Sequence, residues 1–148
     1  MRADAVGGMA KVLIIEDSAS QAAVISEIVE KAGHASVIYQ DLTKGIAQTF
    51  KTIGPDIVLL DLVLLGPNGK PIADGFQICR EIKRVSKGKA KVVIVSAKGD
   101  DESAEWAVLQ GADAFLQKPF AVDDLLSVMN EVLGITPPPP PEPGTGEV

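Results

Sequence analysis

Short apolar runs recur along the chain and are separated by segments with a different periodicity. The runs at 12–15, 57–60, 92–95 and 114–116 contain mostly aliphatic residues without polar alternation. Uninterrupted runs of this kind predict strands that are buried on both faces, as in parallel sheets covered by helices. A less apolar run at 35–39 predicts a further strand, which we place at an edge of the sheet.

Apolar residues between these runs recur every three or four positions, which is the spacing of one helical face. Ser18 and Asp41 precede two of these segments, and both can accept hydrogen bonds from the free N–H groups of a first helical turn. The expected helices span about 18–33, 41–53, 75–87, 101–110 and 122–133.

Five strands that alternate with five helices predict an α/β domain with one parallel sheet and helices on both faces. Right-handed connections place the carboxyl ends of all strands along the same edge of the sheet. Ligands of open α/β sheets bind at this edge. The polar residues that follow each apolar run are therefore the first candidates for a functional site.

Polar side chains with complementary chemistry follow four of the runs. Glu16 and Asp17 follow the first run and Asp61 follows the run at 57–60, whereas Ser96 and Lys118 come after the last two runs. Three neighbouring carboxylates repel one another, and Mg²⁺ with its preference for oxygen ligands would relieve that repulsion. Mg²⁺ and a lysine around a carboxylate nucleophile are suited to phosphoryl transfer.

The length, apolar content, net charge and cysteine count limit the kinds of protein that this chain can be. The 148 residues fit one domain, and 46% apolar with only 4% aromatic residues predicts an aliphatic core. A net charge of −6 argues against nucleic-acid binding by this domain, which would need a basic patch. Cys79 is the single cysteine, so an internal disulfide is excluded and a reducing, cytoplasmic location is expected. We expect its side chain to fill the core as a small apolar group. No apolar run has the length of a membrane span.

The two ends of the chain differ from its middle. Residues 1–10 are expected to form a loose lead-in, and 11–134 the folded domain. Residues 135–148 contain the run Pro137–Pro141 and are expected to be a disordered tail or the start of a linker. His34 follows Gly33 at the end of the first helix, and we expect it in a solvated turn.

The motifs at the strand ends resemble, in this order, those of the receiver domain of two-component response regulators, and the resemblance covers about residues 10–134. It implies a flavodoxin-like, doubly wound (βα)5 fold with strand order 2-1-3-4-5. The matching segments are 12–18, 56–62, 74–76, 92–97, 111–113 and 118–120.

The resemblance implies a role for each acidic residue. Asp61 would accept a phosphoryl group from a sensor histidine kinase or a phosphotransfer protein, with Mg²⁺ as the cofactor. Asp17 and Asp61 would bind the metal directly, Glu16 would act through water, and the main-chain carbonyl of Val63 would be a further ligand. The domain would be a signalling module that catalyses only its own phosphorylation and slow dephosphorylation.

The resemblance also implies a switch. Ser96 and Lys118 would contact the phosphoryl group, Phe115 would rotate inward as Ser96 moves, and Pro119 would follow a cis peptide bond. This motion would change the surface formed by the helix at 101–110, the strand at 114–116 and the last helix. A downstream protein, an output domain or a second copy of the chain would recognise that surface.

One segment departs from the family pattern. Gly75 follows Asp61 by 14 positions, which is more than the family usually has, and the extra residues at about 65–72 include several helix and strand breakers. We expect a long loop beside the acidic site. The proline that the family carries past the acceptor could be Pro67 or Pro71.

Three other functions are less favoured by the sequence than this one. A module that binds its partners without phosphorylation remains an alternative because of the long loop. A phosphohydrolase of the haloacid-dehalogenase type is less favoured, since Val63 stands where that group needs a second aspartate. A dinucleotide site would need a glycine-rich turn after the first strand, where Asp17-Ser18-Ala19 stands. The chain is expected to be a stand-alone regulator or the receiver portion of a longer protein.

Overall fold

The computed structural model describes residues 10–39, 45–61, 63–65, 71–97, 108 and 111–135, with the backbone alone at 63–65 and 71–74. Five parallel strands form the main sheet in the order β2-β1-β3-β6-β7, which confirms the predicted order 2-1-3-4-5. The strands are β1 (Lys11–Ile15), β2 (Ala35–Tyr39), β3 (Ile57–Asp61), β6 (Lys91–Ser96) and β7 (Ala114–Gln117).

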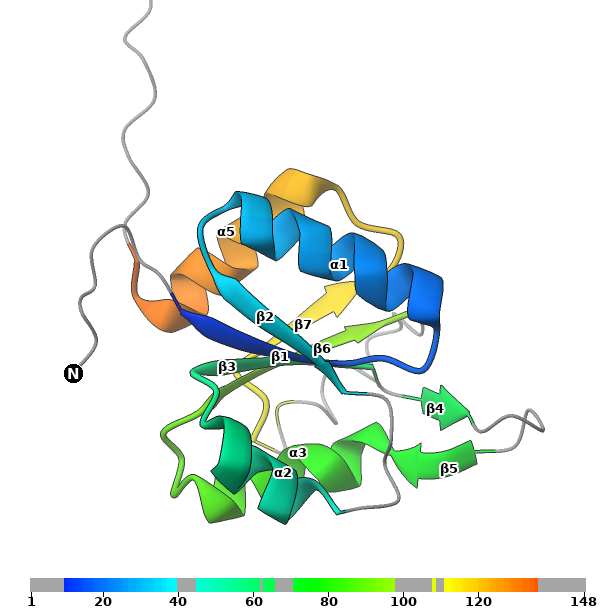
Figure 1. The fold of residues 1–148 in the computed structure, drawn as a ribbon, viewed down its shortest axis with the longest axis vertical. Helices are drawn as coiled ribbons and strands as arrows, with labels where there is room; N and C mark the ends of the chain where they lie inside the picture. Colours follow the sequence, from blue (N-terminus) through cyan, green and yellow to red (C-terminus); the bar gives the residue numbers. More distant parts are fainter. Residues whose placement is uncertain are drawn as a thin grey trace, which may run out of the picture.

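In the part of the chain that the structure describes, two helices cover each face of this sheet, as can be followed in Figure 1. On one face lie α1 (Ala19–Lys31) and α5 (Val122–Leu133), and on the other lie α2 (Ile46–Ile53) and α3 (Gly75–Val85). Nearly all of the predicted helix at 101–110 lies outside the described residues. No helix in the described part of the chain is long and apolar enough to cross a membrane.

Successive residues of the inner strands face opposite layers of helices. In β1, Val12 and Ile14 pack with the α1 and α5 side, whereas Leu13 and Ile15 pack with the α2 and α3 side. All four side chains are at most 1% exposed. The two covered faces explain why the apolar runs show no polar alternation.

The start of the first helix agrees with its predicted cap, whereas the start of the second does not. The Oγ atom of Ser18 accepts a hydrogen bond from the backbone N–H of Gln21 at 3.3 Å. Helix α2 instead begins at Ile46, and its N-cap is Gly45 with φ +80°. The predicted cap Asp41 lies outside the described residues.

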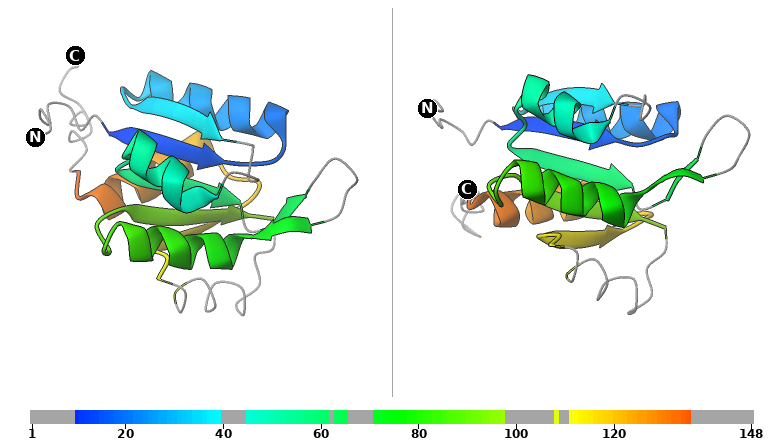
Figure 2. Two further views of the ribbon diagram at one scale, coloured as in Figure 1. Left: turned by 60° about the horizontal axis from the view of Figure 1, so that its bottom comes forward. Right: turned by 90° about the horizontal axis from the view of Figure 1, so that it is seen from below.

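The predicted long loop after Asp61 is wrong in part, because the chain forms an antiparallel hairpin there. Strand β4 (Val63–Leu65) pairs with β5 (Pro71–Asp74), with an irregularity between Leu64 and Leu65. Figure 2 shows this hairpin projecting away from the main sheet. Apolar residues on both sides of the sequence Gly-Pro-Asn-Gly are compatible with a hairpin, although the same glycine and proline residues also indicate a loop.

The expectation that His34 is solvated is wrong. Its side chain is only 7% exposed, and its Nδ1 atom accepts a hydrogen bond from the backbone N–H of Ala10 at 3.0 Å. Burial lowers the pKa of His34 from its ordinary value of 6.5. The imidazole thus covers the start of β1. Cys79 is buried as predicted, and burial raises the pKa of its thiol to about 11.

Candidate functional site

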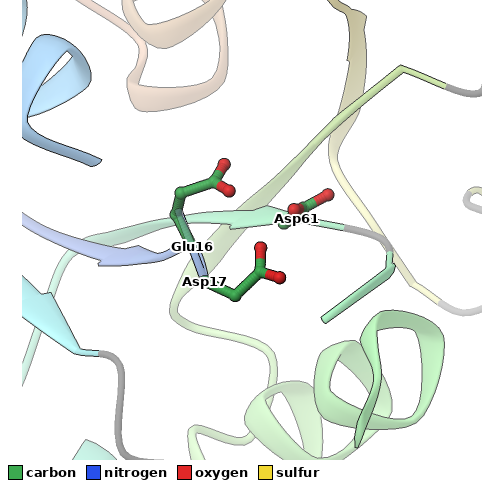
Figure 3. A group of neighbouring side chains, drawn as sticks. All are labelled: Glu16, Asp17 and Asp61. Carbon is green, nitrogen blue, oxygen red and sulfur yellow. The ribbon is translucent and has the colours of Figure 1, made fainter. Parts of the chain in front are cut away.

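Three carboxylates meet at the carboxyl edge of the main sheet (Figure 3). Strands β1 and β3 are parallel neighbours in which Ile15 is paired with Leu60. The residues that follow this pair, Glu16, Asp17 and Asp61, therefore emerge side by side. Each offers one carboxylate oxygen, and these three atoms lie within 4.8 Å of one another. The sequence had predicted this group from the strand ends alone.

Glu16 is the most deeply buried of the three. It is 3% exposed, whereas Asp17 and Asp61 are half-buried. A buried carboxylate is stable only with hydrogen-bond or ionic partners. Glu16 has both kinds, because its Oε2 atom accepts the N–H of Ser18 at 3.2 Å and its Oε1 atom contacts the Nζ atom of Lys118 at 2.7 Å.

Lys118 supplies a positive charge to this group. It follows β7, and its side chain is 17% exposed. Its Nζ atom lies 2.7 Å from Oε1 of Glu16, 2.6 Å from Oε1 of Gln21 and 3.8 Å from Oδ2 of Asp61. Within these side chains, one ammonium faces three carboxylates. The excess negative charge is suited to a divalent cation.

A backbone hydrogen bond joins Ser96 to Lys118. Ser96 is the last residue of β6 and is 2% exposed, and its carbonyl accepts the backbone N–H of Lys118 at 2.8 Å. The peptide bond between Lys118 and Pro119 is cis. Strands β6 and β7 thus deliver a hydroxyl and an ammonium to the edge where the carboxylates stand.

Two further residues with predicted roles lie on β7 and β4. Phe115 lies on β7, opposite Ile94, and is a half-buried side chain that packs against the core on the α2 and α3 side. Its rotation stays a prediction. Val63 begins β4 two positions past Asp61, and its main chain pairs with that of Asp74.

Gln21 joins the site without having been predicted. It lies in the first turn of α1, and its side-chain oxygen accepts a hydrogen bond from Nζ of Lys118. The available signal was its position three residues past the cap Ser18, which directs the start of α1 toward the strand ends. A lone glutamine has too little chemical character to stand out in a sequence.

An apolar groove opens beside Lys118. Its volume is about 520 Å³, and Val24 and Val122, which are 56% and 50% exposed, contribute to its walls. Helix α1 forms one side, and the chain between β7 and α5, which includes Phe120, contributes to the other. The acidic group therefore adjoins a surface on which a macromolecule could make apolar contacts.

One protein family matches most of this chain. The family described as "Response regulator receiver domain" matches residues 12–130. Protein PilH of Pseudomonas aeruginosa is 32% identical over 126 residues, which cover 84% of this chain and 98% of PilH. The transcriptional regulatory protein YxdJ of Bacillus subtilis is 31% identical over 119 residues, which cover 80% of this chain but only 48% of YxdJ.

A solved structure has a similar fold over most of this chain. NtrX from Brucella abortus superposes with a TM-score of 0.74 at 28% identity, over 85% of this chain and 27% of that chain. The chain thus spans nearly all of one relative and half or less of the two others. What those longer proteins do as a whole does not transfer directly to this chain.

Proposed function

Because the chain belongs to the response regulator receiver domain family, we propose that it is a signalling domain switched by phosphorylation of Asp61. The observation that supports this most strongly is the group of three carboxylates at one sheet edge, with the Lys118 ammonium 3.8 Å from Asp61. A carboxylate nucleophile, a cation site and a fixed positive charge are the parts that phosphoryl transfer needs.

In the proposed reaction, a carboxylate oxygen of Asp61 attacks the phosphorus atom of a phosphohistidine on a partner protein. A P–O bond forms, the P–N bond breaks, and the histidine nitrogen keeps the electron pair. Lys118 and the Ser96 hydroxyl then contact the oxygens of the transferred group. Neighbouring strands bring the backbones of both residues to this edge of the sheet, which supports these proposed contacts.

The carboxylates fit Mg²⁺, because their oxygens are the ligands that this ion prefers. In the proposal, Asp17 and Asp61 bind the ion directly, Glu16 contributes through water, and the Val63 carbonyl completes the protein ligands. A bound Mg²⁺ would offset the negative charge that gathers on the phosphoryl oxygens.

The proposed partners follow from this role. A sensor histidine kinase or a phosphotransfer protein would donate the phosphoryl group in the cytoplasm, and the apolar groove beside Lys118 offers it a contact surface. The output would be a change at the surface that includes β7 and α5, driven by Ser96 and Phe115. A downstream protein, an output domain or a second copy of the chain would bind there.

The proposal is tested by measuring the intact mass of the protein after incubation with acetyl phosphate. With Mg²⁺ present, the wild-type protein should gain one phosphoryl group. Asp61→Asn should gain none, and neither should the wild-type protein with the metal chelated. An equal gain in Asp61→Asn, or no gain in the wild-type protein, would contradict the proposed role of Asp61.

A further inference from the structure

We infer that Gln21 is a positioning residue that fixes the Lys118 ammonium for contact with the phosphoryl group on Asp61. The inference rests on the proposed function and adds a residue that the family resemblance did not imply. Gln21 lies outside the acidic group and is exposed, yet its Oε1 atom lies 2.6 Å from Nζ of Lys118.

Two of the three N–H donors of the Lys118 ammonium already have acceptors. A lysine ammonium carries three N–H groups and accepts nothing. Glu16 and Gln21 each accept one, at 2.7 and 2.6 Å. The remaining neighbour is Oδ2 of Asp61 at 3.8 Å, which is beyond hydrogen-bond distance. One donor is thus left for an acceptor that extends from Asp61, as a phosphoryl oxygen would.

Gln21 is itself held in place by a closed set of contacts. Its backbone N–H donates to Oγ of Ser18 at 3.3 Å, and the N–H of Ser18 donates to Oε2 of Glu16 at 3.2 Å. Glu16 and Gln21 then share Lys118 through their side chains. The cap of α1 therefore positions both acceptors of the ammonium at once.

The neutral amide matters as much as its position. A long lysine side chain has many rotamers, and two acceptors restrict it before the phosphoryl group arrives. A second carboxylate at position 21 would restrict Lys118 equally well but would repel the incoming anion. Glutamine restrains the ammonium without cancelling its charge.

The test compares Gln21→Met with the wild-type protein. Methionine has a similar length but lacks the strong acceptor oxygen. Gln48→Met is the matched control, since Gln48 is an exposed glutamine of α2 on the other face of the sheet. Binding of trifluoroberyllate, a phosphoryl mimic, is followed by ¹⁹F NMR with Mg²⁺. Loss of one charged hydrogen bond should weaken binding about fivefold to tenfold in Gln21→Met only.

A second readout reports the positioning directly. Proton exchange of the Lys118 ammonium is measured by ¹H–¹⁵N NMR without any mimic, and the signal is assigned by its loss in Lys118→Met. Exchange should be several-fold faster in Gln21→Met than in the wild-type protein or Gln48→Met. A merely structural effect of the substitution would not act selectively on this one ammonium.

The outcomes separate this inference from the proposed function. If the wild-type protein binds trifluoroberyllate and Gln21→Met binds it equally or more tightly, the positioning role is wrong while the phosphoacceptor site stands. If the wild-type protein binds no mimic and gains no phosphoryl group, the proposed function fails. The ammonium exchange then still shows whether Gln21 holds Lys118.

Discussion

The carboxylates at the two edges of the main sheet have different partners. At the amino edge, Oδ2 of Asp113 accepts two hydrogen bonds. One comes from Nζ of Lys83 at 2.6 Å and the other from the backbone N–H of Val92 at 2.8 Å. Oδ2 of Asp56 likewise accepts the backbone N–H of Lys11 at 2.8 Å. At the carboxyl edge, by contrast, three carboxylates crowd around one ammonium.

This difference separates charges that support the fold from charges of the site for which we propose phosphoryl transfer. Each acid of the amino edge joins two segments that are distant in sequence. The acids of the carboxyl edge come from one pair of strands, and we expect their proximity to lower the stability of the protein when no cation is bound. The largest effects on stability should therefore have opposite signs at the two edges.

Asp113→Ala should give the largest change in stability. The substitution leaves the Lys83 ammonium and the Val92 N–H without their shared acceptor, and it should lower the free energy of unfolding by about 2 kcal/mol. Urea denaturation at pH 7 measures this. The control is Glu27→Ala in the exposed pair with Lys31, where about 0.5 kcal/mol or less is expected. Equal effects of the two substitutions would remove the contrast between the partly buried pair and the exposed pair.

Asp17→Asn should act in the opposite direction. Neutralising one of three clustered carboxylates relieves repulsion, so the free energy of unfolding should rise by about 1 kcal/mol when divalent cations are chelated. Adding Mg²⁺ should stabilise the wild-type protein and leave the variant nearly unchanged. The same urea titrations, run with EDTA and with Mg²⁺, measure both effects. A variant less stable than the wild-type protein in EDTA would show that the cluster is not repulsive.

His34 should give the smallest effect and one that depends on pH. Because burial lowers its folded-state pKa, the unfolded state binds more protons below the ordinary value of 6.5. Stability due to neutral His34 is present above pH 6.5 and is lost as the pH falls toward the lowered pKa. Unfolding free energies between pH 7 and 5 should fall less steeply in His34→Gln. Identical slopes would contradict the role of this residue, which is the chain's single histidine.

The main sheet was predictable because each of its inner strands is a short continuous run of apolar residues. Residues of β1 and β3 are apolar on both faces, and that pattern is legible without tertiary information. The hairpin of β4 and β5 was missed because its strands are short and the sequence between them contains glycine and proline, which also indicate loops. The burial of His34 was missed because it depends on a contact with Ala10, 24 positions away.

The acidic site was predictable for a related reason. Parallel strands bring their carboxyl ends together, so the sequence alone groups Glu16, Asp17 and Asp61. The part played by Gln21 could not be inferred, since it depends on the side-chain path of Lys118, which comes from the other end of the chain. Long-range polar contacts of this kind leave no periodic trace in a sequence.

Among the three carboxylates, we expect Asp61 to receive the phosphoryl group. Borohydride reduces an aspartyl phosphate to homoserine, which peptide mass spectrometry locates. After treatment with acetyl phosphate and Mg²⁺, homoserine should be found at position 61 and should be absent when the metal is chelated. Reduction at Glu16 or Asp17, or a phosphoryl gain that borohydride leaves intact, would contradict the claim.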